Sequence, residues 1–402
     1  MSAPLVPADE DALAAAVAAA HRSGETLAVE GNASKAGLLR PVAASRRLST
    51  RALCGITLYS PQELILSARA GTTLAEIEQA VAGHGQHLIA EPPDFSALFA
   101  STAPQTLGGV VAANLSGPRR VAWGATRDHV MGVRAVNGIG ERIHSGGRVL
   151  KNVTGLDLCK LLAGSHGTLA VITEITLKVL PAPERRATLV LCGLDAARGV
   201  AALAAALGSP YAVSGAAHLP ADMAARIPAL AWLDGAVTLA RIEDFPASVA
   251  YRTQRLRDEL AAFGAAEILD EGATRAAWAA LRDATPLAGE SGAIWRVSVR
   301  PSRGPVVAAE AARALDARWF LDWGGGLVWI AGPASVAAHA AVAAAARAAG
   351  GTCTLFRAPA ALRAAVDVIP AEAPALAAIT RRVKAAFDPR SILNPGRMFA
   401  GV

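Results

Sequence analysis

Residues 164–173 read GSHGTLAVIT, and TLK at 176–178 follows them before Pro181. The glycines predict a turn that lets a ligand approach the backbone, because small side chains leave room beside the main chain. From Val171 to Leu180 the alternation of side chains predicts a half-buried strand, which Pro181 and Pro183 end. A turn of small residues that leads directly into a strand is the most informative pattern in the chain for the fold class.

Further loops of small residues precede this turn. They lie at 31–35 (GNASK), 104–109 (PQTLGG), 115–118 (LSGP) and 124–128 (GATRD). A dinucleotide diphosphate carries two negative charges, and turns that align successive N–H groups can bind it. Each loop alone is more often a plain connector. The spacing of these loops alone therefore indicates a phosphorylated cofactor but does not identify which one.

Several cofactor and metal signatures are missing from the sequence. GxGxxG does not follow the first predicted strand, which counts against a nicotinamide Rossmann domain. GxxxxGK[ST] and HExxH are also absent. Cys54, Cys159, Cys192 and Cys353 are far apart and form no CxxC pair, so zinc and iron–sulfur sites are not expected.

Composition narrows the class of protein. The 402 residues predict two or three domains, and 53% hydrophobic with 18% charged residues indicates a globular chain. The net charge of +6 is spread along the chain, which argues against nucleic acid as a partner. Neither a signal peptide nor a transmembrane segment is recognisable. We expect a cytoplasmic protein.

Taken in order, the loops resemble the FAD-binding domain of flavoproteins of the vanillyl-alcohol oxidase/p-cresol methylhydroxylase type. That family has a glycine/serine loop, an AGT turn, TxGG, GxxxDxVxG and GSxGTLxVIT before TLKxxP. The corresponding segments here are 31–35, 70–72, 106–109, 124–132, 164–173 and 176–181, and the tail at 393–397 (LNPGR) is similar to the family's closing motif.

Within that family, residues 151–161 (KNVTGLDLCKL) are similar to the KNVxGxDxxKL segment of the FAD-binding E subunits of bacterial glycolate oxidase. The resemblance implies a subunit of a complex that oxidises glycolate to glyoxylate. Its implied partners are a related FAD-containing catalytic subunit and an iron–sulfur subunit, which could also hold it at the inner membrane. Asp157 and Lys160 are equally well explained as a helix-surface pair.

The resemblance also assigns cofactor-binding roles. The residues implied for the diphosphate are Gly31, Asn32, Ala33, Ser34, Lys35, Thr106, Leu107, Gly108 and Gly109. Those implied for the ribityl or isoalloxazine side are Ser116, Gly117, Thr126, Arg127 and Asp128, although Arg127 and Asp128 could equally form a local ion pair. Gly167, Thr168 and Ile172 are implied for the adenosine half, and Asn394 closes over the flavin.

Two departures from the family pattern refine this reading. The first loop contains no histidine, so a non-covalent FAD is expected. It also has Asn32 and Ala33 where tighter loops have glycine, which weakens its expected hold on the phosphates.

The second domain lacks the HxxGDGNxH signature of related 2-hydroxy-acid dehydrogenases. His218 and His339 are isolated, so no metal ligand and no catalytic residue is predicted there. Arg296, Arg300 and Arg303 could clamp a carboxylate, but an amphipathic strand with exposed arginines is the favoured interpretation.

The predicted fold class is α+β. A two-subdomain FAD-binding domain covers 1–182, divided near residue 55 into 1–55 and 56–182. An α+β cap domain with an antiparallel sheet covers 183–378, and a tail at 379–402 returns to the flavin site. Two alternatives stay open for the function: an autonomous FAD-dependent 2-hydroxy-acid dehydrogenase and a scaffold subunit without flavin.

Overall fold

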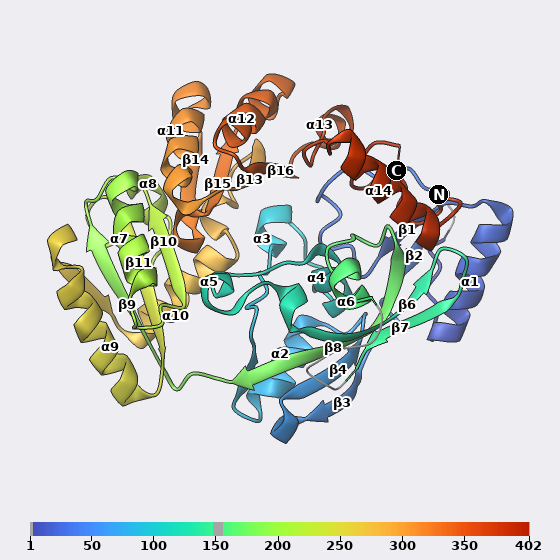
Figure 1. Cartoon of the computed structure of the whole chain (residues 1–402), viewed down its shortest axis with the longest axis horizontal. Helices are drawn as coiled ribbons and strands as arrows, with labels where there is room; N and C mark the ends of the chain where they lie inside the picture. Colours follow the sequence, from blue (N-terminus) through green and yellow to red (C-terminus); the bar gives the residue numbers. More distant parts are fainter. Residues whose placement is uncertain (1–2, 148–155, 402) are drawn as a thin grey trace.

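The computed structural model describes residues 3–147 and 156–401. Residues 151–155 of the predicted KNVxGxDxxKL segment therefore lie outside the described residues. The α+β class is confirmed, because helices alternate with mostly antiparallel strands along the chain (Figure 1).

The N-terminal region is a small α/β unit. Helix α1 (Glu10–Ser23) begins after Asp9, whose carboxylate accepts a hydrogen bond from the Ala12 N–H, and ends at Gly24 in the left-handed conformation. Strands β1 (Leu27–Glu30) and β2 (Arg46–Ser49) pair in parallel beside it. The predicted helix at 9–22 and the strand at 27–30 are confirmed.

A six-stranded antiparallel sheet follows within the described residues. Its strands are β3 (Ile56–Ser60), β4 (Ile65–Arg69), β5 (Gln86–Leu88), β6 (Val130–Asn137), β7 (Arg142–Gly146) and β8 (Ala170–Pro181). The central strand β8 is the predicted strand at 171–180, and it pairs with β4, β5 and β6. The predicted hairpin is also confirmed, because β6 and β7 flank the turn at 138–141.

Short helices connect these strands. They are α2 (Leu74–Ala82), α3 (Ser96–Phe99), α4 (Leu107–Ala113), α5 (Arg120–Trp123) and α6 (Leu158–Leu162), with 3-10 helices η1 (Pro61–Glu63) and η2 (Thr126–His129). Thr73 and Thr106 begin α2 and α4, and the side chain of each accepts the backbone N–H of the third residue of its helix.

The cap contains an eight-stranded antiparallel sheet in the order β12-β9-β11-β10-β14-β15-β13-β16 among the described residues. Its strands are β9 (Arg185–Cys192), β10 (Gly215–Leu219), β11 (Val237–Asp244), β12 (Ala266–Leu269), β13 (Ala293–Ser298), β14 (Arg318–Asp322), β15 (Leu327–Gly332) and β16 (Thr352–Arg357). This confirms the antiparallel sheet predicted for the cap.

Helices cover the cap sheet. They are α7 (Ala196–Gly208), α8 (Ala221–Ala224), α9 (Pro246–Glu259), α10 (Glu271–Arg282), α11 (Gly304–Leu315) and α12 (Val336–Ala348), with 3-10 helices η3 (Ala261–Phe263), η4 (Thr285–Leu287), η5 (Pro301–Arg303) and η6 (Trp323–Gly325). One continuous cluster of buried apolar side chains joins this sheet to the six-stranded sheet. The cap is therefore packed onto the first domain.

Buried ion pairs also join the two domains. Arg119 of the first domain contacts Glu243 of β11 at 2.7 Å, and Arg241 of β11 contacts Glu91 at 2.9 Å. Arg186 of β9 adds a third guanidinium, 3.1 Å from Glu243. These charges compensate each other, so the network holds the cap in one orientation on the first domain.

The chain then returns to its beginning. Helices α13 (Ala360–Ala365) and α14 (Pro374–Phe387) leave the cap, and Figure 1 shows both termini beside α14 and β1. Leu27 forms a parallel bridge with Leu393. Arg40 of the first domain already bonds to the carbonyls of Ala364 and Val366. The C-terminal segment therefore rejoins the first domain from about residue 360. Helix α14 spans residue 378, where the sequence predicted the boundary between the cap and the tail.

Candidate functional site

A cavity of about 320 Å³ lies where the N-terminal loop, α4, the 164–168 turn and the C-terminal tail meet. Eight of the residues that were predicted to bind the cofactor line this cavity: Gly31, Asn32, Ala33, Ser34, Lys35, Thr106, Gly109 and Asn394. Loops that are distant in sequence thus converge on one space, as a shared diphosphate site requires.

The first loop presents backbone donors to this cavity. Within residues 3–147 and 156–401, no acceptor bonds to the N–H groups of residues 32–35. Ala33 has a φ of 56°, which is the left-handed region. Residues that turn in this way can aim successive N–H groups at one anion. The loop therefore fits a phosphate even though it is poor in glycine.

The start of α4 forms the opposite wall. A Cβ on Gly31 would lie 2.4 Å from Oγ1 of Thr106, so only glycine lets the two segments approach this closely. Leu107 and Gly108 lie behind this wall, because their N–H groups donate to the carbonyls of Thr72 and Ala70. The TxGG segment therefore presents Thr106 and Gly109 to the cavity.

Three cations line the cavity: Lys35, Arg363 and Arg397. Burial lowers the pKa of Lys35 to about 8, and burial together with the neighbouring Arg363 lowers the pKa of Arg397 to about 10. A lowered pKa means that the charged form is poorly compensated. A ligand with two negative charges, such as a dinucleotide diphosphate, would compensate these cations.

Asn394 connects three walls of the cavity. Its Oδ1 accepts the Val29 N–H at 2.8 Å, and its Nδ2 donates to the carbonyl of His166 at 2.8 Å. The side-chain amide of Asn394 is thus hydrogen-bonded to the protein itself. It holds the three segments together and also lines the cavity. Burial, together with Arg397, lowers the pKa of His166 to about 3, so its ring is neutral.

The residues predicted for the isoalloxazine side do not line this cavity. Ser116 Oγ accepts the Thr126 N–H at 2.9 Å, and the Thr126 hydroxyl donates to the Leu115 carbonyl. Gly117 donates its N–H to Ala90 and accepts from Trp323 Nε1 at 3.1 Å. These loops brace the contact between the domains, and their role toward the flavin ring stays a prediction.

Arg127 and Asp128 have local partners. Asp128 Oδ2 accepts the Ala125 N–H at 2.8 Å, which begins η2, and its Oδ1 lies 3.8 Å from Arg127 Nε at the surface. This agrees with the local ion pair that the sequence left open. Asp157 similarly accepts the Lys160 N–H at 3.2 Å and begins α6.

The residues predicted for the adenosine half lie behind the tail. Gly167 has a φ of 69°, and a Cβ there would be 3.0 Å from Asn394 Nδ2. The Thr168 N–H donates to Ser165, and its carbonyl accepts from Lys384 at 2.6 Å. Ile172 is buried in β8. Their contact with the cofactor also stays a prediction.

The sequence reasoning missed His166, Arg363 and Arg397 as cavity residues. His166 and Arg397 lie inside the GSHGT and LNPGR motifs, so both could have been found by taking every polar residue of each motif. Arg363 lies on α13, outside any motif, and only the fold reveals that it reaches the cavity.

The histidines of the cap are hydrogen-bonded within it. His218 bonds to Thr238 at 2.9 Å, and His339 bonds to Trp295 and to the carbonyl of Asp367 at 3.1 Å each. In the part of the chain that the structure describes, no group of three or more His, Cys, Asp or Glu side chains could hold a metal ion.

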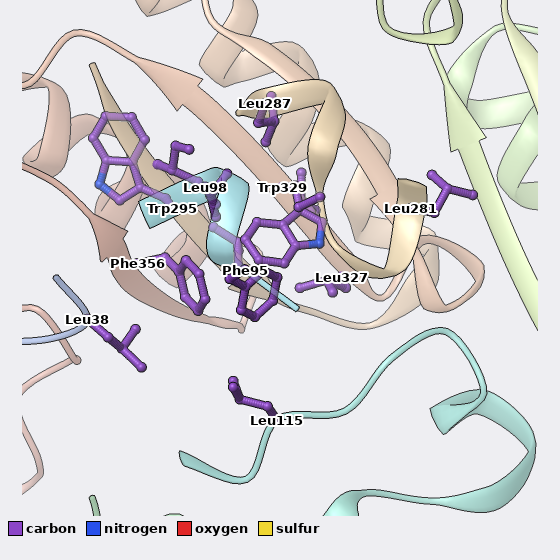
Figure 2. Close-up of a cluster of buried hydrophobic side chains, with 14 of the residues drawn as sticks. Leu38, Phe95, Leu98, Leu115, Leu281, Leu287, Trp295, Leu327, Trp329 and Phe356 are labelled. Carbon is purple, nitrogen blue, oxygen red and sulfur yellow. The ribbon is translucent and has the colours of Figure 1, made fainter. Parts of the chain in front are cut away.

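One expectation for the cap was wrong. Arg296 was expected to be exposed on an amphipathic strand, but its guanidinium is packed against Trp323, Trp329 and Phe356. Figure 2 shows Trp329 and Phe356 converging in this aromatic cluster, with Leu115 of the first domain facing it. A strand forms here as predicted, but both of its faces are largely covered, and the face that carries Arg296 meets the first domain instead of solvent.

Comparisons with known proteins agree with this geometry. The FAD binding domain family matches residues 2–146, and the C-terminal domain family of FAD linked oxidases matches residues 369–398. The second match covers the tail that completes the cavity.

Two relatives share sequence with the chain. The glycolate oxidase subunit GlcE of Escherichia coli (strain K12) is 35% identical over 376 residues, which are 93% of this chain and 93% of that protein. The glycolate oxidase subunit GlcD of Bacillus subtilis (strain 168) is 36% identical over 129 residues, which are 32% of this chain and 26% of that protein.

Solved structures share the fold. p-Cresol methylhydroxylase with bound substrate superposes with a TM-score of 0.73 at 13% identity, covering 99% of this chain and 88% of that one. Alkyldihydroxyacetonephosphate synthase superposes with a TM-score of 0.71 at 17% identity, covering 98% and 77%. At these identities the likeness concerns the fold alone.

Proposed function

Because the chain belongs to the family of FAD-linked oxidoreductases that includes the glycolate oxidase subunit GlcE, we propose that it is the FAD-binding subunit of a complex that oxidises glycolate to glyoxylate. The observation that carries this proposal is the 35% identity to GlcE, which extends over 93% of both chains. A likeness of this extent includes both the cofactor domain and the cap.

The cofactor is FAD, and the cavity fits its diphosphate. The free N–H groups of the first loop and the poorly compensated Lys35 and Arg397 would hold the two negative charges. The first loop has no histidine side chain, which supports non-covalent binding. When bound, FAD supplies the capacity to accept two electrons, and the protein supplies binding, orientation and charge.

We further propose that the chain works beside a related FAD-containing catalytic subunit and an iron–sulfur subunit. Its own flavin then relays electrons or supports assembly. The internal hydrogen bonds of His218 and His339 support this division of labour, because neither imidazole is placed as a base. No helix among the described residues has the length and apolar character needed to span a bilayer.

A second candidate function is an autonomous FAD-dependent 2-hydroxy-acid dehydrogenase. The half-buried Arg296 favours it, because a cationic group at the domain junction could bind a substrate carboxylate. Anaerobic mixing of the isolated chain with glycolate tests this candidate. Bleaching of the oxidised flavin absorption would support it, and an unchanged spectrum would leave catalysis to the partner subunit.

The main proposal is tested by rebuilding the complex with and without this chain. Glycolate-dependent dye reduction should vanish when the chain is left out and return when it is added. Full activity without the chain would overturn the proposal.

A variant without FAD separates the two roles within the complex. Lys35→Met combined with Arg397→Met should release the cofactor, and a pull-down then shows whether the variant still assembles. If it assembles into an inactive complex, the flavin relays electrons. If the assembled complex is active, the chain serves assembly.

A further inference from the structure

A second cavity, of about 400 Å³, lies where α2 and β5 of the first domain face α10 of the cap. It shares no lining residue with the cavity proposed for FAD. Ala182, in the link that joins β8 to β9, also lines it, and Figure 1 shows this link crossing from one domain to the other. Cavities of this size commonly hold small molecules.

One face of α10 supplies much of the wall. Arg275, Trp278, Ala279 and Arg282 all line the cavity, and their spacing places them on the same side of the helix. Leu88 of β5 adds apolar surface from the first domain. The wall therefore combines an apolar surface with guanidinium groups.

Carboxylates outside the cavity hold three of the arginines in place. Oε1 of Glu271 accepts from Arg275 Nε at 2.8 Å and from Arg186 Nη1 at 3.2 Å, so these two guanidinium groups lie close together. Arg282 donates from Nε and Nη2 to Asp283 at 2.8 Å each. Neither Glu271 nor Asp283 lines the cavity. Each guanidinium is thus oriented by a carboxylate that leaves part of it unused.

The unused donors belong to residues of the cavity wall. Among the described residues, no acceptor bonds to Nη1 of Arg282, to Nη1 and Nη2 of Arg275, or to Nη2 of Arg186. Guanidinium groups with open N–H donors are well suited to oxyanions, because the planar fork matches their oxygens.

Two further arginines of the wall are already bonded within the protein. Both terminal nitrogens of Arg241 donate to Glu91, at 2.9 and 3.0 Å. Arg119 bonds to Glu243 and to Nδ1 of His87. Burial, together with Arg119, lowers the pKa of His87 to about 3, so its ring is neutral and can accept this bond. These two arginines join the domains, and the other three remain open to a ligand.

We propose that this cavity binds a small organic phosphate. Arg186, Arg275 and Arg282 hold the phosphate group, and the apolar part of the ligand lies beside Trp278. A phosphate monoester offers three acceptor oxygens and about two negative charges at neutral pH, so it can bond to several guanidinium groups at once. A single carboxylate offers fewer acceptors and less charge. The site is separate from the FAD cavity, and the inference does not depend on the proposed function.

Calorimetric titration of the full chain loaded with FAD tests this inference, because the flavin then occupies the other cationic cavity. Phenyl phosphate is the ligand that is titrated. Phenol, which lacks the phosphate, and benzoate, which carries a carboxylate in its place, are the ligand controls. Phenyl phosphate should bind saturably at a single site, benzoate should bind about tenfold more weakly, and phenol should not bind in the same range.

Arg275→Gln and Arg282→Gln should each raise the Kd for phenyl phosphate by about five- to tenfold, because each removes a partly exposed charge-assisted bond. Arg313→Gln is the matched control, since Arg313 is an exposed arginine of another cap helix, α11. Its Kd should equal that of the wild-type chain.

A variant with the opposite effect separates charge from a folding defect. Glu78 of α2 lines the cavity, and among the described residues its carboxylate forms no hydrogen bond. Its charge repels an anionic ligand, so Glu78→Gln should lower the Kd for phenyl phosphate. A folding defect would not strengthen binding.

Four results would overturn the inference. They are a wild-type chain that shows no saturable binding of phenyl phosphate, equal binding of benzoate, an unchanged Kd in both arginine variants, and a Kd that does not fall in Glu78→Gln. Restoration of glycolate oxidation by the chain is a separate measurement, so the proposed function and this inference can fail independently.

Discussion

The side-chain oxygen of Asn394 lies 2.8 Å from the backbone nitrogen of Val29, which is 365 positions earlier in the chain. The same amide donates to the carbonyl of His166. One side chain thus joins the first strand, the GSHGT turn and the tail, and it does so at the wall of the cavity proposed for FAD.

Replacing Asn394 by alanine should lower both stability and cofactor retention. The Val29 N–H and the His166 carbonyl would lose their partners, which predicts a loss of about 1–3 kcal/mol in the free energy of unfolding. Urea unfolding measures this loss, and the ratio of flavin to protein absorbance measures FAD. Asn32→Ala is the control for stability, because Asn32 makes one exposed hydrogen bond to Pro104. An Asn394→Ala chain as stable as this control would contradict the prediction.

Lys35 should make FAD binding depend on pH. Its pKa is about 8 in the cavity, and the diphosphate should raise it, so binding is accompanied by proton uptake. Affinity should be full below pH 8 and should fall by up to about tenfold per pH unit above it. Fluorescence titration of FAD into apoprotein between pH 6.5 and 9.5 measures this slope.

Two variants at this position isolate its charge. Lys35→Met should weaken binding at low pH and lose the slope, whereas Lys35→Arg should keep the charge and give a flat profile. If the affinity for FAD still falls with pH in Lys35→Met, the pH dependence belongs to another titrating group.

Ala33→Gly should stabilise the first loop. Alanine in the left-handed region costs about 1–2 kcal/mol, and the greater entropy of unfolded glycine offsets part of the relief. We expect a net gain of about 0.5–1 kcal/mol in the free energy of unfolding, measured by urea denaturation. Ala36→Gly is the matched control, since Ala36 lies outside the left-handed region, and it should destabilise the chain. Equal effects at both positions would rule out relief of backbone strain.

Glu243→Gln should loosen the cap. Burial alone would raise the pKa of Glu243, but Arg241 and Arg119 hold it well below its usual range. Its charge therefore stabilises the folded state at pH values above about 4.5, and the contribution is lost as the pH falls through the folded pKa. At pH 7 the variant should be less stable by about 2–4 kcal/mol, because three guanidinium groups lose a shared partner.

The pH dependence separates this effect from a general defect. The difference in urea midpoint between the wild type and Glu243→Gln should be largest near neutral pH and should shrink below about pH 4.5. Glu259→Gln on the exposed face of α9 should leave the midpoint unchanged. A difference that does not vary with pH would refute the role of the charge.

Local patterns predicted the local structure well. Asp9 and Gly24 delimit α1 as capping rules suggest, and Gly138 and Gly140 mark the β6–β7 turn. The first loop, Thr106, Gly109 and Asn394 could be placed at one cavity because the family resemblance supplied the order of the motifs.

Long-range geometry could not be predicted in the same way. Arg296 has the spacing of an exposed strand residue, and only the position of the first domain shows that it faces aromatic rings. Ser116 and Thr126 look available in sequence, yet they bond to each other across a turn. Arg363 reaches the cavity from a helix without a motif. Each of these depends on which surfaces meet, and that information is spread over the whole chain.

The meeting of the first strand with the tail constrains how the protein matures. Arg397 and Asn394 are translated after the entire cap, so a nascent chain that has only its first 182 residues has one side of the cofactor cavity missing. On the proposed binding mode, FAD is held fully only after synthesis has passed residue 397. A chain interrupted within the cap would therefore lack Asn394 and Arg397, and with them one wall of the cavity proposed for FAD.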